Sequence, residues 1–316
     1  MLYFLFKSKY FPTNISFKKN NKNSNTENGG DKMCELFGVC SKDCIPINNY
    51  LHQFYKHCEQ HPHGWGLALM RENQSLIEKE AIKASESKEL EKLLEKPIIV
   101  NHAFAHIRLA TMGCQNSFNC HPFSRSDNTG RTWTLIHNGT VFKCGLLNQY
   151  MSQQIGQTDS ERILLHIIDE INEKQEQKSL LLNEDELFNI IDNIISKLAK
   201  GNKLNLLLFN EDVVYAHSNY KNSLYYLNED DKVFIATTPL SDEAWKEFPI
   251  NRVISFKNGQ LSKKGKVHNN EYEISQEDFE FIFEHVSPEL KNTLLKSCGE
   301  LNNAKECQCP YYKSGS

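Results

Sequence analysis

The sequence lacks any apolar run of 18 or more residues, which excludes a transmembrane helix. It also lacks a basic stripe, since 40 Asp and Glu outnumber 36 Lys and Arg and the net charge is −4. Six lysines stand against one Asp and one Glu in residues 1–32, so this segment carries +4 and the remainder carries −8. A net acidic body argues against nucleic acid as the main partner. We therefore expect no membrane and no nucleic-acid partner.

A disulfide framework is also not expected. Ten cysteines spread over 316 residues would be unusual for one, because such frameworks belong mainly to small secreted domains. Free thiols in a reducing compartment are the better interpretation, and we predict a cytoplasmic location. Cys298, Cys307 and Cys309 lie close together, but three thiols at this spacing do not form a standard zinc pattern.

No metal and no cofactor are expected elsewhere in the chain. The stretch HCEQHPHGWG contains His57, Cys58, His61 and His63, which are residue types that bind metals. Without a clear facial pair of histidines plus a carboxylate, a structural loop is the better interpretation. A protein that binds zinc here or at the terminal cysteines remains the least favoured alternative.

The first 33 residues differ from everything that follows. Six apolar residues open the chain, and a Lys- and Asn-rich stretch then runs to Met33, a composition that predicts disorder. A secretory signal would place charge before a longer apolar region, and a transit peptide would be richer in arginine. Three interpretations remain open at this point: an upstream start codon that is not the real one, a removable leader, or a permanent flexible tail.

From Cys34 the pattern changes to alternating strands and helices. Strands are predicted on both sides of two consecutive helices at about 159–173 and 184–200. We further expect a helix opened by Pro46, a charged helix at about 85–95, and a hairpin formed by GWGLALMRE and SLIEKEA. This order indicates an α+β fold, in which helices cover sheets rather than alternate with every strand. Residues 268–316 are expected to form a polar helical appendage with a loose end.

Several short motifs are ambiguous when each is taken alone. In IHNGTV, Asn138 and Gly139 predict a tight type I′ turn, yet the same pair would supply the two N–H donors of an oxyanion hole. In AHIRLATMG, Arg108 is either a solvated strand residue or, with Thr111, a carboxylate-binding group. TDSE is typical of a helix N-cap, with Thr158 or Asp159 as the capping residue.

Taken together, these motifs resemble the class II glutamine amidotransferases, the N-terminal-nucleophile hydrolases that begin with cysteine. The resemblance covers about 230 residues from Cys34, and the later strands look like those of the stand-alone YafJ-type members. It implies a four-layer αββα fold, with two mostly antiparallel sheets between helical layers, over residues 34–267. Six motifs carry it in the family's order: MCELFGV, GWGLA, AHIRLAT, NCHPF, HNG and TDSE.

The resemblance also implies a role for each matching residue. Cys34 would attack the side-chain amide of glutamine, with its own α-amine as the base, and form a thioester. Asn138 and the N–H of Gly139 would stabilise the oxyanion. Three further residues would bind the substrate: Arg108 with Thr111 would hold the α-carboxylate of glutamine and Asp159 its α-ammonium. His121, in the family's HPF turn, would shape the pocket.

This chemistry implies that residues 1–33 are absent from the active form. An amide-bonded Cys34 has no basic amine, so we expect the active chain to begin at Cys34, through initiation at Met33 or through leader cleavage. No fused synthase domain is expected, so ammonia would pass to a separate synthase or be released. Two alternatives remain: hydrolysis of another γ-glutamyl compound, and a catalytically silent binding subunit that keeps its leader.

Overall fold

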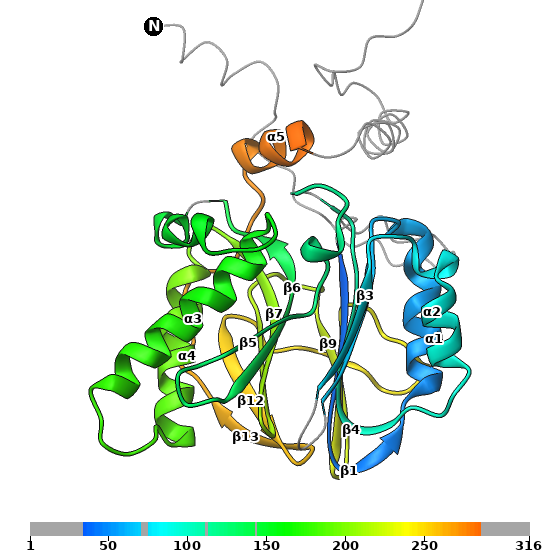
Figure 1. Cartoon of the computed structure of the whole chain (residues 1–316), viewed down its shortest axis with the longest axis horizontal. Coiled ribbons are helices and arrows are strands. Elements are labelled where there is room, and N and C mark those ends of the chain that lie inside the picture. The colour runs from blue at the N-terminus through cyan, green and yellow to red at the C-terminus, as the bar shows by residue number, and fades with distance from the viewer. Residues whose placement is uncertain (1–33, 71–74, 111–112, 143, 286–316) are drawn as a thin grey trace, which may run out of the picture. The chain divides into compact units, whose positions relative to one another are not determined.

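Two antiparallel β-sheets lie face to face in the computed structural model, and helices cover their outer faces (Figure 1). The structure describes residues 34–70, 75–110, 113–142 and 144–285. Every neighbouring pair of strands in the two sheets of these residues is antiparallel. The predicted four-layer α+β arrangement is therefore confirmed.

The first sheet has seven strands, with β1 and β4 near its centre. In spatial order these are β11 (Lys246–Glu247), β9 (Tyr225–Glu229), β10 (Lys232–Ala236), β1 (Glu35–Pro46), β4 (Ile99–Ile107), β2 (Trp65–Met70) and β3 (Leu76–Glu80).

The second sheet has six strands. In spatial order these are β13 (Gln260–Lys264), β12 (Arg252–Lys257), β8 (Val213–Ser218), β7 (Lys203–Asn210), β6 (Thr132–Thr140) and β5 (Phe123–Ser126).

Four of the five α-helices in the described ranges cover the outer faces, two on each. The α-helices are α1 (Asn48–Lys56), α2 (Lys88–Leu94), α3 (Asp159–Glu176), α4 (Glu184–Leu198) and α5 (Gln276–His285), and the 3₁₀ turns are η1 (His57–Gln60), η2 (Ala84–Glu86), η3 (Ser117–Asn119) and η4 (Gly145–Ser152). The pair α1 and α2 covers the first sheet, and the pair α3 and α4 covers the second (Figure 1). No helix in the described ranges is both long and apolar enough to cross a membrane.

Strict alternation along the strands builds the apolar layers. On β1, Phe37 and Val39 pack outward under α1, whereas Leu36 and Cys40 face the second sheet. A strand buried on both faces has this continuous apolar pattern, because successive side chains point to opposite sides. The sheets therefore enclose a dry interior that holds their strand ends in fixed register.

The predicted elements agree with the structure in most places. Strands β2 and β3 form the expected hairpin, and the two long helices start at the predicted Asp159 and Glu184. The prediction that Pro46 opens a helix is wrong, because Pro46 ends β1 and pairs with Ile99. Proline is tolerated at such a strand terminus as well as at a helix start, so local sequence does not separate the two.

Part of the C-terminal segment packs on the two-sheet body. The N–H of Tyr272 donates to the carbonyl of Asn219 (2.8 Å), and its ring stacks on Phe142. The predicted domain boundary after residue 267 stays a prediction, and residues 1–33 and 286–316 lie outside the described ranges.

Gly66 provides a test of the packing between the first sheet and the HPF turn. A Cβ at this position would overlap the backbone carbonyl of His121, which cannot move as a flexible side chain can. We expect Gly66→Ala to lower the free energy of unfolding by about 2 kcal/mol or more, because overpacking against backbone displaces a strand or a turn.

The matched control is Gly145→Ala, where a new Cβ meets nothing within 4 Å. Its effect should stay within about 0.5 kcal/mol in urea denaturation. Equal stability of the two variants would show that the HPF turn does not press on β2.

Candidate active site

The cysteine and the arginine singled out from the sequence lie side by side at one end of the first sheet. Cys34 directly precedes β1 and Arg108 directly follows β4, and the pairing of Glu35 with Ile107 brings the two together. The thiol of Cys34 donates to the Leu109 carbonyl and accepts from the Leu109 N–H, both at 3.3 Å. The strand register therefore fixes the position of the sulfur atom.

The pKa of the Cys34 thiol lies above its usual range, chiefly because the group is buried. The Leu109 hydrogen bond and the positive charge of Arg108 oppose this rise, while the negative charge of Asp159 adds to it. Both charged residues are thus close enough to act on the sulfur. At neutral pH the group is a thiol that needs a proton acceptor before it can attack.

The Asn-Gly pair lies in a strand and not in a turn. Asn138 and Gly139 belong to β6 and pair with Asn205 and Leu204 of β7. The turn interpretation of this dipeptide is therefore wrong. Asn138 is 4% exposed, and its Oδ1 has no hydrogen-bond partner in the described ranges. A buried amide oxygen without a partner is rare in folded proteins, which marks Asn138 as a candidate ligand-binding group.

A bond between the sheets connects the two strand ends. The Nε2 of His106 on β4 lies 3.3 Å from the carbonyl oxygen of His137 on β6. Because His137 and Asn138 are adjacent, this contact sets the Asn138 end of the second sheet against the Arg108 end of the first. This contact positions the two strands without adding a charge, because burial lowers the pKa of His106 to about 3 and keeps its ring neutral.

Arg108 is buried, and its guanidinium holds a neighbouring loop. Nη1 donates to the Cys114 carbonyl and Nη2 to the Gly113 carbonyl, each at 3.2 Å. These bonds orient the planar fork at the edge of the site. Thr111, the predicted helper of Arg108, lies outside the described residues.

Asp159 is the first residue of α3, and its carboxylate is already bonded to backbone. Oδ2 accepts from the N–H of Val141 (2.7 Å) and Oδ1 from that of Ser160 (2.9 Å). Thr158 is the N-cap, as its side chain accepts from the N–H of Glu161 (3.3 Å). The predicted cap is confirmed, and it points the helix N-terminus and its carboxylate at the end of β6.

His121 is buried next to a cis peptide bond to Pro122. Its ring centroid lies 4.1 Å from that of His106 and 4.8 Å from that of Phe123, and neither ring nitrogen has a hydrogen-bond partner in the described ranges. Burial and the neighbouring positive groups hold the pKa of His121 well below its ordinary value. Its predicted role in shaping the pocket stays a prediction.

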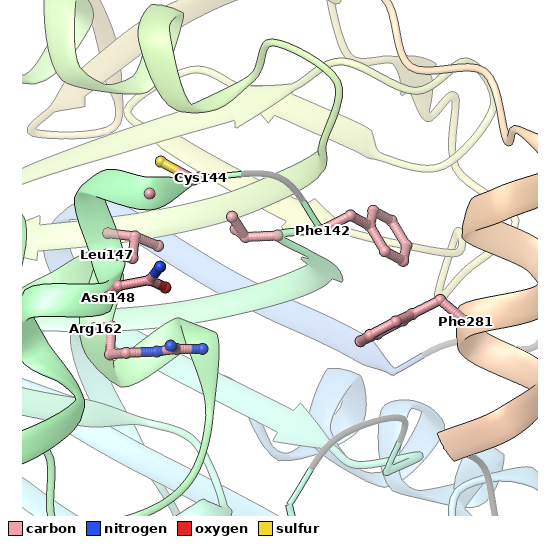
Figure 2. A pocket seen from close by; sticks show the side chains of 8 residues that line it. Phe142, Cys144, Leu147, Asn148, Arg162 and Phe281 are labelled. Atoms are coloured by element: carbon pink, nitrogen blue, oxygen red, sulfur yellow. The ribbon is translucent and has the colours of Figure 1, made fainter.

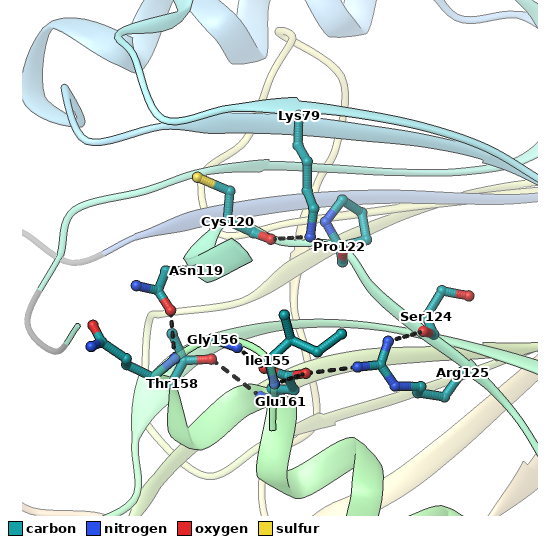
Figure 3. Close-up of polar contacts among 11 residues, drawn as sticks. Lys79, Asn119, Cys120, Pro122, Ser124, Arg125, Ile155, Gly156, Thr158 and Glu161 are labelled. Atoms are coloured by element: carbon teal, nitrogen blue, oxygen red, sulfur yellow. Dashed lines mark hydrogen bonds and ion pairs between the residues drawn. The ribbon is translucent and has the colours of Figure 1, made fainter. Parts of the chain in front are cut away.

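Supporting residues that the sequence did not reveal hold the HPF turn and the α3 N-terminus (Figure 3). Lys79 donates to the carbonyls of Cys120 (2.7 Å) and Pro122 (3.1 Å), on either side of His121. Asn119 accepts from the N–H of Gln157 (2.6 Å). These partners are 38 to 43 positions apart in the chain, so no local pattern could have indicated them.

Glu161 lies in the first turn of α3, as the sequence predicts, but it also bonds to residues outside the helix. Its carboxylate accepts from the N–H groups of Ile155 (3.0 Å) and Gly156 (2.8 Å) and pairs with Arg125 (2.8 Å) (Figure 3). The loop that leads into Asp159 is thereby fixed from both sides.

The histidine stretch holds the residues around Cys34 and Arg108 through hydrogen bonds. The Nδ1 of His57 lies 2.8 Å from the Glu35 carboxylate, directly beside Cys34. The Nδ1 of His63 accepts from the N–H of Ala110 (2.9 Å), and the carbonyl of Gly64 accepts from the N–H of Arg108 (2.8 Å). The loop therefore anchors both Cys34 and Arg108, in agreement with the structural interpretation.

Comparisons with known proteins identify similar sequences. An uncharacterized protein of Methanocaldococcus jannaschii is 27% identical over 261 residues, covering 74% of this chain and 72% of that protein. A protein of Escherichia coli named "putative glutamine amidotransferase YafJ" is 25% identical over 189 residues, covering 58% and 72%.

A solved structure shows the same fold. The glutamine phosphoribosylpyrophosphate amidotransferase of B. subtilis superposes with a TM-score of 0.56 at 18% identity, over 75% of this chain and 50% of that one. The family model described as "Glutamine amidotransferases class-II" matches residues 33–230, more than half of the sequence. This chain therefore belongs to the class II glutamine amidotransferases, an assignment that agrees with its two-sheet fold.

Proposed function

We propose that this chain hydrolyses the side-chain amide of glutamine, or a related γ-glutamyl amide, with Cys34 as an N-terminal nucleophile. Family membership supports glutamine amide hydrolysis in general. The observation that carries the finer proposal is the surroundings of the Cys34 sulfur. Its hydrogen bonds in the described ranges go to the backbone of Leu109, and none goes to an imidazole.

A thiol without a histidine partner needs another base. The three buried histidines behind the site are poor candidates, because burial lowers the pKa of His106 to about 3 and also lowers those of His121 and His137. The α-amino group of Cys34 would be the closest alternative, with an ordinary pKa of about 7.7–8.0. It is basic only when no residue precedes Cys34, so the proposal requires a chain that begins there.

The proposed reaction has two stages. The α-amine takes the thiol proton as sulfur attacks the amide carbon, and the Asn138 amide with the Gly139 N–H stabilises the oxyanion. As the C–N bond breaks, the amine returns the proton to the leaving ammonia. Water next attacks the thioester, and glutamate leaves with Cys34 restored. Ammonia passes to a separate synthase or to solvent.

Substrate recognition is assigned to the charged pair around the sulfur. The Arg108 fork binds the α-carboxylate with Thr111, Asp159 binds the α-ammonium, and the neutral ring of His121 shapes the pocket.

All seven cysteines of the described ranges are free thiols, which supports the proposed cytoplasmic location.

The nucleophile is tested by Cys34→Ala on protein whose mass shows a start at Cys34. Glutamate release should fall to background, because the variant has no atom to form the thioester. The matched control is Cys44→Ala, an exposed thiol on β1, which should keep the wild-type rate. Equal glutaminase rates in Cys34→Ala and wild type would refute the mechanism, and a native chain that starts at Met1 would favour the silent-subunit alternative.

The oxyanion role is tested by Asn138→Ala. We expect kcat to fall by roughly 10² to 10³ with little change in KM, because the amide would act mainly in the transition state. The contrasting variant is Asn205→Ala, whose amide donates to Ser223 (2.7 Å) and should cost about 1 kcal/mol of stability while kcat stays within a few fold. A kcat loss of the same size in both variants would make Asn138 a structural residue.

The contact between His57 and Glu35, the residue after Cys34, is expected to depend on pH. The hydrogen bond to Glu35 raises the pKa of His57 above the ordinary 6.5. The folded-state pKa is the higher one, so this contribution is present below about 6.5 and is lost as pH rises through the folded value. We expect His57→Gln to destabilise the protein by up to about 1 kcal/mol at about pH 6 and far less at about pH 9, since the pair is partly exposed.

Urea denaturation at the two pH values measures this difference. The control is His52→Gln, which replaces an exposed histidine of the preceding helix α1 and should show no such dependence. A His57→Gln effect that is independent of pH would mean that the pair carries no charge.

A further inference from the structure

A cavity of about 210 Å³ lies beyond the end of β6, between η4, α3 and α5 (Figure 2). None of the residues assigned to glutamine above lines it. The side chains that form its walls include those of Phe142, Cys144, Leu147, Asn148, Arg162 and Phe281.

The guanidinium of Arg162 is the unusual group in this cavity. Arg162 is 7% exposed, and its buried Nε has no hydrogen-bond partner in the described part of the chain. Two other arginines, on or next to the second sheet, are paired: Arg125 with Glu161 (2.8 Å) and Arg131 with Glu211 (3.7 Å). A buried charged donor without a partner costs free energy, so its retention indicates that a bound anion completes it.

The two carboxylates nearest in sequence are engaged elsewhere. Asp159 accepts from the N–H groups of Val141 and Ser160, and Glu161 accepts from those of Ile155 and Gly156 and pairs with Arg125. Neither forms an ion pair with Arg162 in the described part of the chain. A bound anion would therefore not have to displace either carboxylate.

The opposite wall of the cavity is aromatic. Phe142 and Phe281 meet edge to face, with ring centroids 5.7 Å apart, and Figure 2 shows them across the cavity from Arg162 and the side-chain amide of Asn148. A ligand that fits both walls carries an oxyanion at one end and an apolar or planar body at the other. The planar guanidinium fork matches a carboxylate in a bidentate manner.

We propose that this cavity is a second ligand site, separate from the glutamine site, which binds a small carboxylate with an apolar body. Its wall is continuous with the proposed catalytic residues, since Val141 bonds to Asp159 and follows the β6 segment that carries Asn138 and Gly139. A carboxylate bound to Arg162 therefore contacts the chain segments that position the glutamine site.

Phenylacetate is the probe, titrated calorimetrically into full-length Cys34→Ala protein. This background contributes no catalysis, so the outcome does not depend on the proposed hydrolysis. We expect saturable 1:1 binding that Arg162→Gln weakens by at least about tenfold, or ~1.4 kcal/mol. The matched control is Arg252→Gln, a partly buried arginine on β12 outside the cavity, which should bind as the parent does.

Acetate and inorganic phosphate separate the ligand classes. Both should bind more weakly than phenylacetate, because acetate lacks the apolar body and phosphate lacks both the body and the carboxylate plane. Phosphate binding tighter than phenylacetate would overturn the carboxylate assignment. Equal affinity of acetate and phenylacetate would contradict the role of the aromatic wall in binding. Unsaturable binding in the parent would contradict the existence of the site.

Thermal unfolding without ligand tests whether the role of Arg162 is purely structural. Arg162→Met keeps the aliphatic stem and removes the unpaired charge, so its melting temperature should equal or exceed that of the parent. A marked decrease in the melting temperature would show that Arg162 stabilises the fold through protein contacts, which contradicts a role in binding ligand.

Discussion

The pairing of β1 with β4 is the constraint on which the site depends. Because Glu35 lies opposite Ile107, Cys34 is placed beside Arg108 and Leu109, and the sulfur is fixed by two backbone bonds. A shift of one residue would turn every side chain of β1 to the other face and expose Phe37 to the wrong layer. The register is thus specified by the apolar layers on both sides of the strand, and it places the proposed nucleophile without a flexible loop.

Electrostatics behind the nucleophile follow from the same burial. Where the two sheets meet, His106, His121 and His137 form a wall whose pKa values are all lowered, so it is uncharged at neutral pH. The formal charges acting on the sulfur come from Arg108 and Asp159, which have opposite signs and opposing effects on its pKa. A zwitterionic substrate end would complement such a pair. In the proposed function this pair recognises the charged end of the substrate, and the thiol stays protonated until a base is available.

Much of this site is predictable from sequence, because its residues occur in short motifs whose order is itself informative. The failures have physical causes. Asn138-Gly139 carries the strongest local signal for a turn, yet eight residues of β6 pair along β7, and the summed strand pairing outweighs one dipeptide. Pro46 likewise ends a strand where a helix start was equally compatible. Lys79 and Asn119 were missed because their partners are distant in sequence and satisfy backbone groups, which no side-chain pattern records.

Arg162 marks the limit of motif-based prediction. It directly follows the TDSE motif, and on sequence grounds it would be an ordinary solvated helix residue. Only the tertiary structure shows that α5 and the segment after β6 enclose it, and that the acidic groups next to it are already committed to backbone N–H groups. The family motifs thus cover the ends of β1, β4 and β6. The adjoining cavity depends on packing against Phe281, which lies far beyond the last motif. Its ligand preference can be inferred only from the structure, which shows which buried charged groups have partners.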